Sequence, residues 1–161
     1  MKGNFDLHVN NISFSSSEAI YQSLKFPDSI EIQRKISAER SPMTAKRIAQ
    51  CYSWKIRPDW ENRKVCAMRI ALRIKALQSK VFYELLLSTK EKEIVEISRK
   101  DNYWGAYLKG DVLVGMNVLG RLLMEVRGET KELIILHIKQ LLKPLNNMKI
   151  AGNLIKVESL I

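Results

Sequence analysis

Hydrophobic residues along the chain recur mostly at intervals of three and four positions, the spacing that predicts α-helices. Serine and proline signals mark where three of these helices begin, because serine caps a helix and proline fits its first turn. The signals are Ser15–Ser17, Asp28–Ser29 and Ser41–Pro42. The longest helix is predicted over about residues 59–77, and a shorter, more buried one over about residues 81–87.

The same spacing predicts which helical side chains face the core. In the helix after Ser41–Pro42, Met43, Ile48 and Ala49 are expected to be buried. The long helix is expected to direct an apolar face inward and to leave its basic side chains mostly to water or to phosphate. The apolar set is Val65, Met68, Ala71, Leu72 and Leu77, and the basic set is Arg63, Lys64, Arg69, Arg73 and Lys75.

Two more helices are predicted towards the C-terminus. One begins after Asn117, runs to about Arg127 and ends at Gly128, since glycine commonly follows a helix end. The other is capped by Thr130 and ended by Pro144.

Strands are predicted to be few and short. Residues 1–14 carry spaced apolar side chains around Asn10–Asn11, a turn signal, and are expected to form a hairpin or edge strand. Residues 93–97 alternate polar and apolar side chains and are expected to form a strand that delivers the loop at Lys100–Gly105. The C-terminal residues 148–161 are also strand-like. The whole pattern predicts a single α+β domain that spans the chain and is predominantly helical.

Length and charge bound the class of protein. The chain has 161 residues, enough for one domain with a substantial core. Lys and Arg outnumber Asp and Glu, 27 to 17, and the formal net charge is +10. This charge favours an anionic partner such as nucleic acid, a nucleotide or an acidic surface, although a basic surface without a specific partner would have the same charge.

The cysteines and the hydropathy of the chain indicate the cellular compartment. Cys51 and Cys66 lie in helical pattern and are expected to be reduced core residues rather than a disulfide or a metal pair. The first residues lack the apolar segment of a signal peptide, and no apolar run reaches the roughly 18 residues of a membrane span. We therefore expect a cytoplasmic protein with no membrane contact.

The stretch Lys100–Arg127 gathers an acid, aromatic residues and glycines around a predicted loop. Glycine lets a backbone approach a ligand closely, and loops carry many binding sites. Asp101 and Trp104 are its candidate functional residues, but Asp101 could equally cap the turn before Tyr103.

Glu18 lies in the first turn of the predicted helix after Ser15–Ser17. Spacings of three and seven residues place Tyr21 and Lys25 on the same side of that helix as Glu18. One interpretation is a charge that stabilises the helix N-terminus. The other is a carboxylate projected into a cleft, with Lys25 as a phosphate ligand.

Trp60, between Asp59 and Glu61, leaves a choice between packing the helix entry against the core and stacking on a base. His8 and His137 stand alone, and no spacing of Cys, His and Asp resembles a metal site. The chain has no Walker-type loop, dinucleotide-binding glycine pattern or nucleophile elbow. We expect no metal and no cofactor.

Five sequence blocks follow one another along the chain: SSSEAIYQSLKF, SPMTAKRIAQ, RPDWENRKVCAMRIALRIKA, LLLST with EIVEIS, and DNYWG with GMNVLGRLLMEVR. In this order they resemble the NADAR family, also called YbiA-like. The resemblance covers about residues 12–127 and implies a YbiA-like fold, with residues 128–161 as a C-terminal extension of helix and strand.

The resemblance also implies cleavage of N-glycosidic bonds. It places Glu18 on the family's catalytic glutamate and Trp60 on a functional tryptophan. Asp101 and Trp104 fall on the acid and the tryptophan of a D-x-x-W-G motif. Further motif positions, expected to bind substrate, are Tyr21, Lys25, Gly105, Asn117 and Gly120.

Two segments depart from the family pattern. Only Gly3-Asn4-Phe5 remains of an aromatic-rich segment that usually precedes the first hairpin. The loop after Trp104, AYLKGDVLVG, is more apolar than the glycine- and lysine-rich family version. The extension after the family core is expected either to pack back on the domain or to mediate dimerisation.

Charge and resemblance together favour hydrolysis of ADP-ribosylated guanine in nucleic acid. Two alternatives stay open. One is hydrolysis of phosphorylated intermediates of riboflavin biosynthesis, and the other is a non-catalytic module that binds ADP-ribose or nucleic acid. The expected partners are an ADP-ribose-containing or phosphorylated ribosyl substrate, with nucleic acid as a further candidate. The sequence does not predict the oligomeric state.

Overall fold

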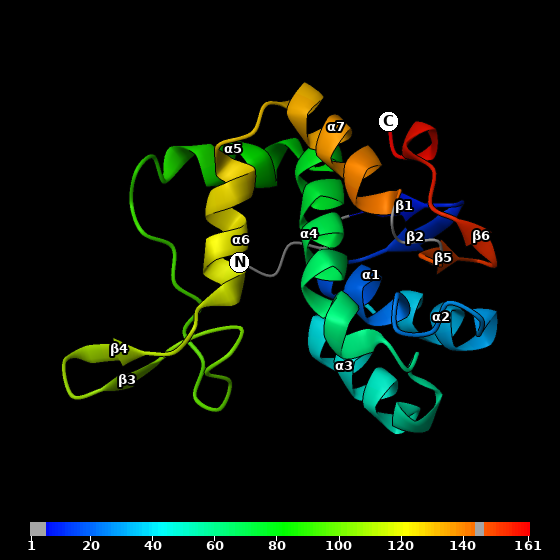
Figure 1. Ribbon diagram of the computed structural model, residues 1–161, viewed down its shortest axis with the longest axis horizontal. Helices are drawn as coiled ribbons and strands as arrows, with labels where there is room; N and C mark the ends of the chain where they lie inside the picture. Colours follow the sequence, from blue (N-terminus) through cyan, green and yellow to red (C-terminus); the bar gives the residue numbers. More distant parts are fainter. Residues whose placement is uncertain (1–5, 144–146) are drawn as a thin grey trace.

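The computed structural model describes residues 6–143 and 147–161, and within them helices dominate over short strands (Figure 1). The helices are α1 (Ser17–Ser23), α2 (Ile30–Ser37), α3 (Pro42–Cys51), α4 (Trp60–Gln78), α5 (Lys80–Ser88), α6 (Val118–Arg127) and α7 (Lys131–Leu142), with 3₁₀ turns η1 (Ser53–Lys55) and η2 (Val157–Ser159). The strands form three antiparallel hairpins: β1–β2 (Leu7–Val9, Ile12–Phe14), β3–β4 (Tyr107–Lys109, Val112–Val114) and β5–β6 (Lys149–Ile150, Asn153–Leu154). The predicted α+β class is confirmed.

The long helix α4 occupies the centre of the fold, and α1, α5, α6 and α7 all pack against it (Figure 1). Five of its side chains are completely buried: Ala67, Ile70, Ala71, Ile74 and Ala76. Small alanines let neighbouring helices approach closely, while the isoleucines fill the space between them. This helix therefore ties the α1–α3 side of the molecule to the α5–α6 side.

The N-terminal hairpin is confirmed over the described residues. Leu7 pairs with Phe14, and both side chains are buried. Asn10 and Asn11 have φ of 49° and 63°, as a two-residue hairpin turn requires. The Phe5 end of the prediction lies outside the described residues.

Only some of the predicted N-cap residues form a capping hydrogen bond through their side chains. Ser16 accepts a hydrogen bond from the backbone N–H of Ala19, and Thr130 accepts one from Leu133. Ser29 and Ser41 stand at the N-cap positions of α2 and α3 but make no side-chain cap bond. The predicted end of α7 at Pro144 lies outside the described residues.

Some burial predictions for the helices are wrong. Met43 is 78% exposed, because α3 packs against α1 and α2 through Ala45 and Ala49 while Met43 lies in its first turn. Cys51, also expected in the core, is exposed at the end of the same helix. Neither Cys51 nor the partly buried Cys66 forms a disulfide within the described residues. In α5 only Leu86 is buried, since this helix covers α4 and α6 with one narrow face.

The strand predicted at residues 93–97 is also wrong. Only one bridge forms there, between Ile97 and Ala106. The Asn117 side chain, rather than a neighbouring strand, pairs with the backbone of Ile94 and Glu96.

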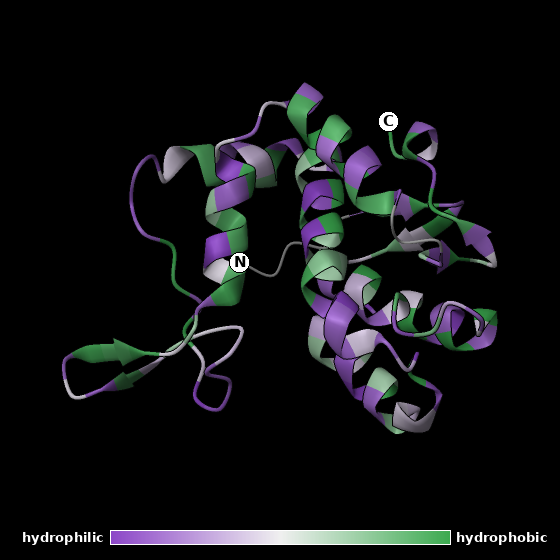
Figure 2. Cartoon of the chain, in the orientation of Figure 1, coloured by the Kyte–Doolittle hydropathy of each residue, from purple (hydrophilic) through white to green (hydrophobic). Residues whose placement is uncertain are grey.

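A hairpin, β3–β4, instead occupies the middle of the predicted Lys100–Arg127 loop. Its turn contains Gly110 with φ of 61°. The hairpin projects from the molecule and is largely apolar (Figures 1 and 2).

The C-terminal extension packs back on the domain. The Asn10 amide donates hydrogen bonds to the carbonyl groups of Ile150 and Asn153. The fully buried Gln33 donates to Lys149 and accepts from Ala151. Hairpin β5–β6 is thereby joined to both β1–β2 and α2. Among the described residues, no helix combines the length and apolar character needed to cross a membrane.

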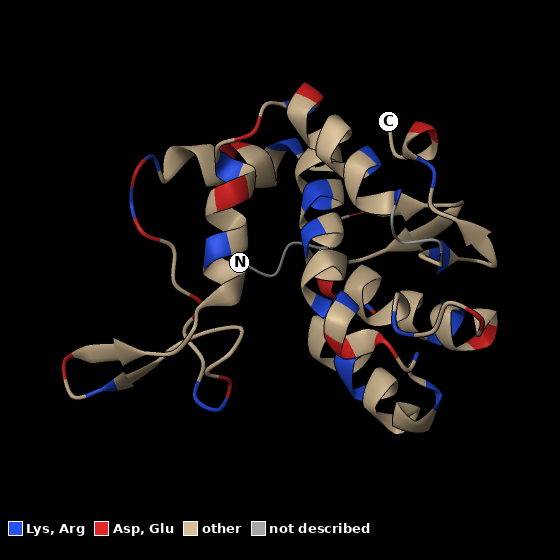
Figure 3. Cartoon of the chain, viewed as in Figure 1, with Lys and Arg blue, Asp and Glu red and all other residues tan. Residues whose placement is uncertain are grey.

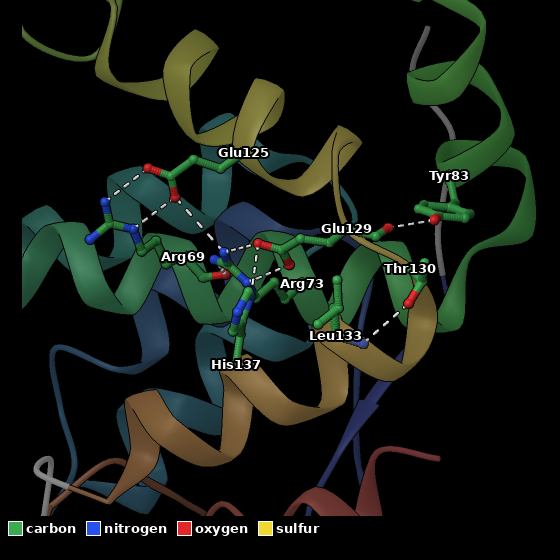
Figure 4. Close-up of polar contacts among 8 residues, drawn as sticks. All are labelled: Arg69, Arg73, Tyr83, Glu125, Glu129, Thr130, Leu133 and His137. Carbon is green, nitrogen blue, oxygen red and sulfur yellow. Dashed lines mark hydrogen bonds and ion pairs between the residues drawn. The ribbon is translucent and has the colours of Figure 1, made fainter.

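Arg73, predicted to face water or phosphate, is instead buried in an ion-pair network between α4, α6 and α7 (Figure 4). Its guanidinium binds both carboxylate oxygens of Glu129, and the side chains of the pair are only 5% and 8% exposed. The Nδ1 atom of His137 lies 3.0 Å from the same carboxylate. One turn away, Arg69 pairs with Glu125 of α6 at 2.9 and 3.0 Å. The network fastens α6 and the start of α7 to α4.

We expect Arg73→Met to lower the free energy of unfolding by about 3 kcal/mol or more, because it leaves the buried Glu129 carboxylate without its main partner. The matched control is Glu84→Gln in the exposed pair with Lys80 on α5, where the free energy of unfolding should hardly change. Urea unfolding of both variants measures the difference. Equal, small losses would contradict a structural role for the buried pair.

Candidate functional site

A cavity of about 410 Å³ opens between α1, the first turns of α3, and the segment that leads into the Asp101 loop. It brings together six of the nine predicted site residues: Glu18, Tyr21, Lys25, Asp101, Trp104 and Gly105. Trp60, Asn117 and Gly120 do not line it. The two sequence regions that meet here are about 80 positions apart, and only the packing around α4 makes them neighbours.

The α1 wall of the cavity contains Glu18, Tyr21 and Lys25, as the helical spacing predicts. Glu18 lies in the first turn and accepts a 2.7 Å hydrogen bond from the amide of Gln22. The Oε1 atom of Gln22 is buried and has no hydrogen-bond partner within the described chain, so its amide is directed by Glu18 alone. Burial holds the pKa of the Lys25 ammonium below its usual value, while the nearby Glu18 carboxylate acts in the opposite direction.

The opposite wall is the turn that begins at Asp101. One carboxylate oxygen, Oδ1, accepts hydrogen bonds from the backbone N–H groups of Tyr103 and Trp104, at 3.1 and 2.9 Å. The capping role considered from the sequence is therefore present. The second oxygen accepts no hydrogen bond within the described residues, and Asp101 also lines the cavity. Capping fixes the carboxyl group and leaves one oxygen for a ligand.

Helix α6 holds this turn in place through its first N–H groups. Asn117, Val118 and Leu119 donate to the carbonyl oxygens of Gly105, Tyr103 and Trp104, at 3.1, 3.1 and 2.9 Å. These donors have no partner inside their own helix, so the turn satisfies them. The Asp-x-x-Trp-Gly motif is thus the N-terminal cap of α6.

An aromatic cluster joins the two walls. The Tyr21 ring lies 5.7 Å from the Trp104 ring, edge to face, and 5.1 Å from the Trp60 ring. Burial raises the pKa of Tyr21, which is therefore a neutral phenol. The Lys25 Nζ atom lies 5.5 Å from the Tyr21 and Trp60 ring centres.

Trp60 packs against this cluster on the side away from the cavity. It is only 7% exposed and packs at the entry of α4, against Tyr21 and Lys25. Of the two roles left open by the sequence, the packing role matches this position.

Asn117 and Gly120 have structural contacts away from the cavity. Asn117 has φ of 48°, and its amide accepts from Glu96 N–H and donates to the carbonyl of Ile94. A methyl group on Gly120 would stand 2.1 Å from that same Ile94 oxygen. Both residues hold the segment that precedes the Asp101 turn.

Sequence reasoning missed several residues that line the cavity: Gln22, Lys46, Glu96 and Ser98. Glu96 belongs to residues 93–97, where a strand was expected but does not form. Its backbone is fixed by Asn117 on one side and by Ala106 N–H, at 2.8 Å, on the other. The alternation of residues 93–97 gives no sign of a cavity. Met43, expected in the core, also lines the cavity.

Metal-ligating side chains are scattered. The described residues contain no group of three or more His, Cys, Asp and Glu side chains that could hold a metal ion.

A model of the NADAR domain matches residues 2–131. The chain belongs to the NADAR domain family. The match extends beyond residues 12–127, over which the motifs show the resemblance, and includes all nine predicted site residues.

Two curated relatives are similar over most of this chain. A riboflavin biosynthesis protein of Vibrio vulnificus is 37% identical over 124 residues, 77% of this chain, which spans only 33% of that protein. N-glycosidase YbiA of Escherichia coli is 37% identical over 123 residues, 76% of this chain and 74% of that protein. N-glycosidases are hydrolases that act on N-glycosyl compounds, and the similarity to YbiA confirms the enzyme class expected for the chain.

The fold is shared as well. The NMR structure of the Escherichia coli protein YbiA matches with a TM-score of 0.66 at 34% sequence identity, covering 87% of this chain and 77% of that one. The predicted YbiA-like fold is therefore confirmed.

We expect Gly120→Ala to lower the free energy of unfolding by about 1–3 kcal/mol, because its methyl group would collide with the Ile94 carbonyl. Displacing that segment should also raise KM for the substrate. Gly128→Ala is the matched control, since its methyl group would have contacts no closer than 3.5 Å and its φ is −80°. Unchanged stability and KM in Gly120→Ala would show that this packing does not hold the Asp101 turn.

Proposed function

We propose that this NADAR protein hydrolyses the N-glycosidic bond that joins ADP-ribose to guanine in nucleic acid. The observation that carries the proposal is the convergence of Glu18 and Asp101, carboxylates from two distant segments, on one cavity that also has an aromatic wall and two lysines. Glu96 adds a third carboxylate to its lining. A ribosyl transition state needs negative charge beside the sugar, and an aromatic surface suits the base.

The proposed reaction adds water to the anomeric carbon of the ribose. The bond from that carbon to the guanine nitrogen breaks, and its electron pair leaves with the base, which takes up a proton. Glu18 accepts the proton of the attacking water or stabilises the positive charge that develops on the ribose. The unpaired oxygen of Asp101 orients the ribose or completes the proton transfer.

The remaining cavity residues have roles that follow from their chemistry. Trp104 and Tyr21 contact the base or ribose, supported from behind by Trp60. Lys25 and the exposed Lys46 bind the phosphates, as ammonium groups do. Gly105 has no side chain, and a methyl group there would stand 2.4 Å from the Glu96 carbonyl, so the turn can pack closely.

The choice of nucleic acid as the carrier of the guanine rests on the net charge of +10. Lys and Arg are spread over several elements, α4 among them, rather than confined to the cavity (Figure 3). A small metabolite needs only a local basic group, whereas a polyanion gains from distributed charge.

A second candidate substrate is a phosphorylated intermediate of riboflavin biosynthesis. The name of the Vibrio vulnificus relative favours it. The same cavity and the same two carboxylates would serve, because this reaction also breaks a bond between ribose and nitrogen.

We expect Glu18→Gln to lower kcat at least about 100-fold, since it removes the carboxylate while keeping the shape of the side chain. Its stability should change little, because glutamine can keep the contact with Gln22. The matched control is Glu84→Gln on α5, an exposed carboxylate remote from the cavity. Full turnover by Glu18→Gln would exclude Glu18 from the chemistry.

The assay supplies two substrates to the wild-type protein: a DNA oligonucleotide that carries ADP-ribosylated guanine, and a ribosylaminopyrimidine phosphate. Mass spectrometry detects the released base and sugar. Release from the oligonucleotide alone supports the proposal, and release from the pyrimidine alone selects the second candidate. Tight binding of ADP-ribose without any product would indicate a non-catalytic module.

A further inference from the structure

A second cavity, of about 620 Å³, lies on the other side of the entry to α4 and belongs to none of the chemistry above. Phe26 and Pro27 line it on one side, and the segment from Trp54 to Asp59 lines it on the other. Its most unusual member is Trp54 of η1, which is 73% exposed. A large aromatic side chain exposed at the edge of a cavity offers a face on which a base can stack.

The Trp54 ring is supported from one side. It lies 5.8 Å from the ring of Tyr52, tilted by 49°. Tyr52 is itself fixed by Lys35, whose Nζ donates a 2.9 Å hydrogen bond to its hydroxyl and lies 5.3 Å from its ring centre. Trp54 thus presents a flat apolar surface at a defined place.

The cavity beside Trp54 carries an excess of positive charge. Arg57 and Arg63 both bind a single carboxylate, Asp59, and one of the two charges stays uncompensated. The hydrogen bonds from Arg57 hold the pKa of the Asp59 carboxyl below its usual value, so this arrangement persists at neutral pH. Lys55, exposed next to Trp54, adds a second positive charge. Asp28, the other carboxylate of the lining, is paired with Lys149 at 3.3 Å.

The two cavities are immediate neighbours. Lys25 lines the first and Phe26, the next residue, lines the second. Arg57 of the second cavity donates a 2.9 Å backbone hydrogen bond to the Lys25 carbonyl. The two cavities therefore adjoin at Lys25 and Phe26.

We propose that the Trp54 cavity binds a nucleotide that flanks the modified guanine in a single-stranded nucleic acid. The base of that nucleotide stacks on Trp54, and its phosphate is held by Lys55 and by Arg63, whose side chain is 31% exposed and binds Asp59 through Nε alone. Stacking on an exposed aromatic beside basic side chains is how proteins bind single strands with little sequence preference. The inference rests on the proposed function only in identifying the guanine, and the cavity itself requires just a polyanion with bases.

The first test compares KM for two substrates, an oligonucleotide with ADP-ribosylated guanine and the isolated ADP-ribosylated guanosine. Trp54→Ala should raise KM about tenfold for the oligonucleotide and leave it unchanged for the nucleoside. Trp54→Phe should retain most of the affinity. The matched control is Val81→Ala, which removes an exposed apolar side chain from α5. Equal effects on both substrates would overturn the inference while the proposed function stands.

The second test needs no catalysis. An unmodified oligothymidylate of about ten nucleotides should quench tryptophan fluorescence, and most of the quenching should disappear in Trp54→Phe. Affinity should fall as NaCl rises, and Lys55→Gln should reduce the salt slope by about one, whereas Lys139→Gln on α7 should not.

The outcomes separate the two proposals. Quenching that depends on Trp54 supports the inference even if ADP-ribosylated guanine is never cleaved. Absence of quenching overturns it, whatever the enzyme cleaves. A change of oligomeric state in Trp54→Ala, measured by light scattering with oligothymidylate binding intact, would assign the surface to a protein contact and likewise overturn it.

Discussion

The attachment of α6 to α4 is the constraint on which the site depends. At its C-terminal end α6 is tied to α4 by the Arg69–Glu125 and Arg73–Glu129 ion pairs, the second of which is buried. At its N-terminal end, N–H groups that have no partner inside the helix donate hydrogen bonds to the carbonyl oxygens of the Asp101 turn. A helix fixed at one end thus delivers a carboxylate at the other, opposite the carboxylate that α1 supplies. Neither ion pairs nor capping bonds touch a substrate, yet they determine where Asp101 stands.

The candidate site is therefore formed between separate parts of the chain and not by a single loop. Its two walls come from distant parts of the chain and meet through Tyr21, which touches aromatic rings on both sides. Close packing explains the two glycines near the site. Gly105 and Gly120 have no side chain, and backbone carbonyl oxygens occupy the space that a side chain would need. Pre-organisation of this kind places charge where the transition state develops it, without rearrangement at the moment of reaction.

Local patterns in the sequence were enough for the helices, their order and the α1 wall, because helical spacing alone puts Glu18, Tyr21 and Lys25 on one side. They were not enough where contacts between distant residues determine the local structure or the burial of a side chain. Alternation at residues 93–97 suggested a strand, but the Asn117 amide replaced the missing strand partner. Arg73 looked like a surface residue until Glu129, 56 positions away, compensated its charge inside the protein. The motifs of the family resemblance singled out Asn117 and Gly120, and the structure gives them packing and hydrogen-bonding contacts instead of a place in the cavity.

The central claim is that one ligand contacts both walls at once. Titration of the ¹⁵N-labelled protein with ADP-ribose, followed by backbone amide shifts, tests it most directly. The account predicts that amides of α1 from Glu18 to Lys25 and of the Asp101–Gly105 turn shift together, with a single dissociation constant. Shifts confined to one wall, or two separate dissociation constants for the two walls, would contradict it.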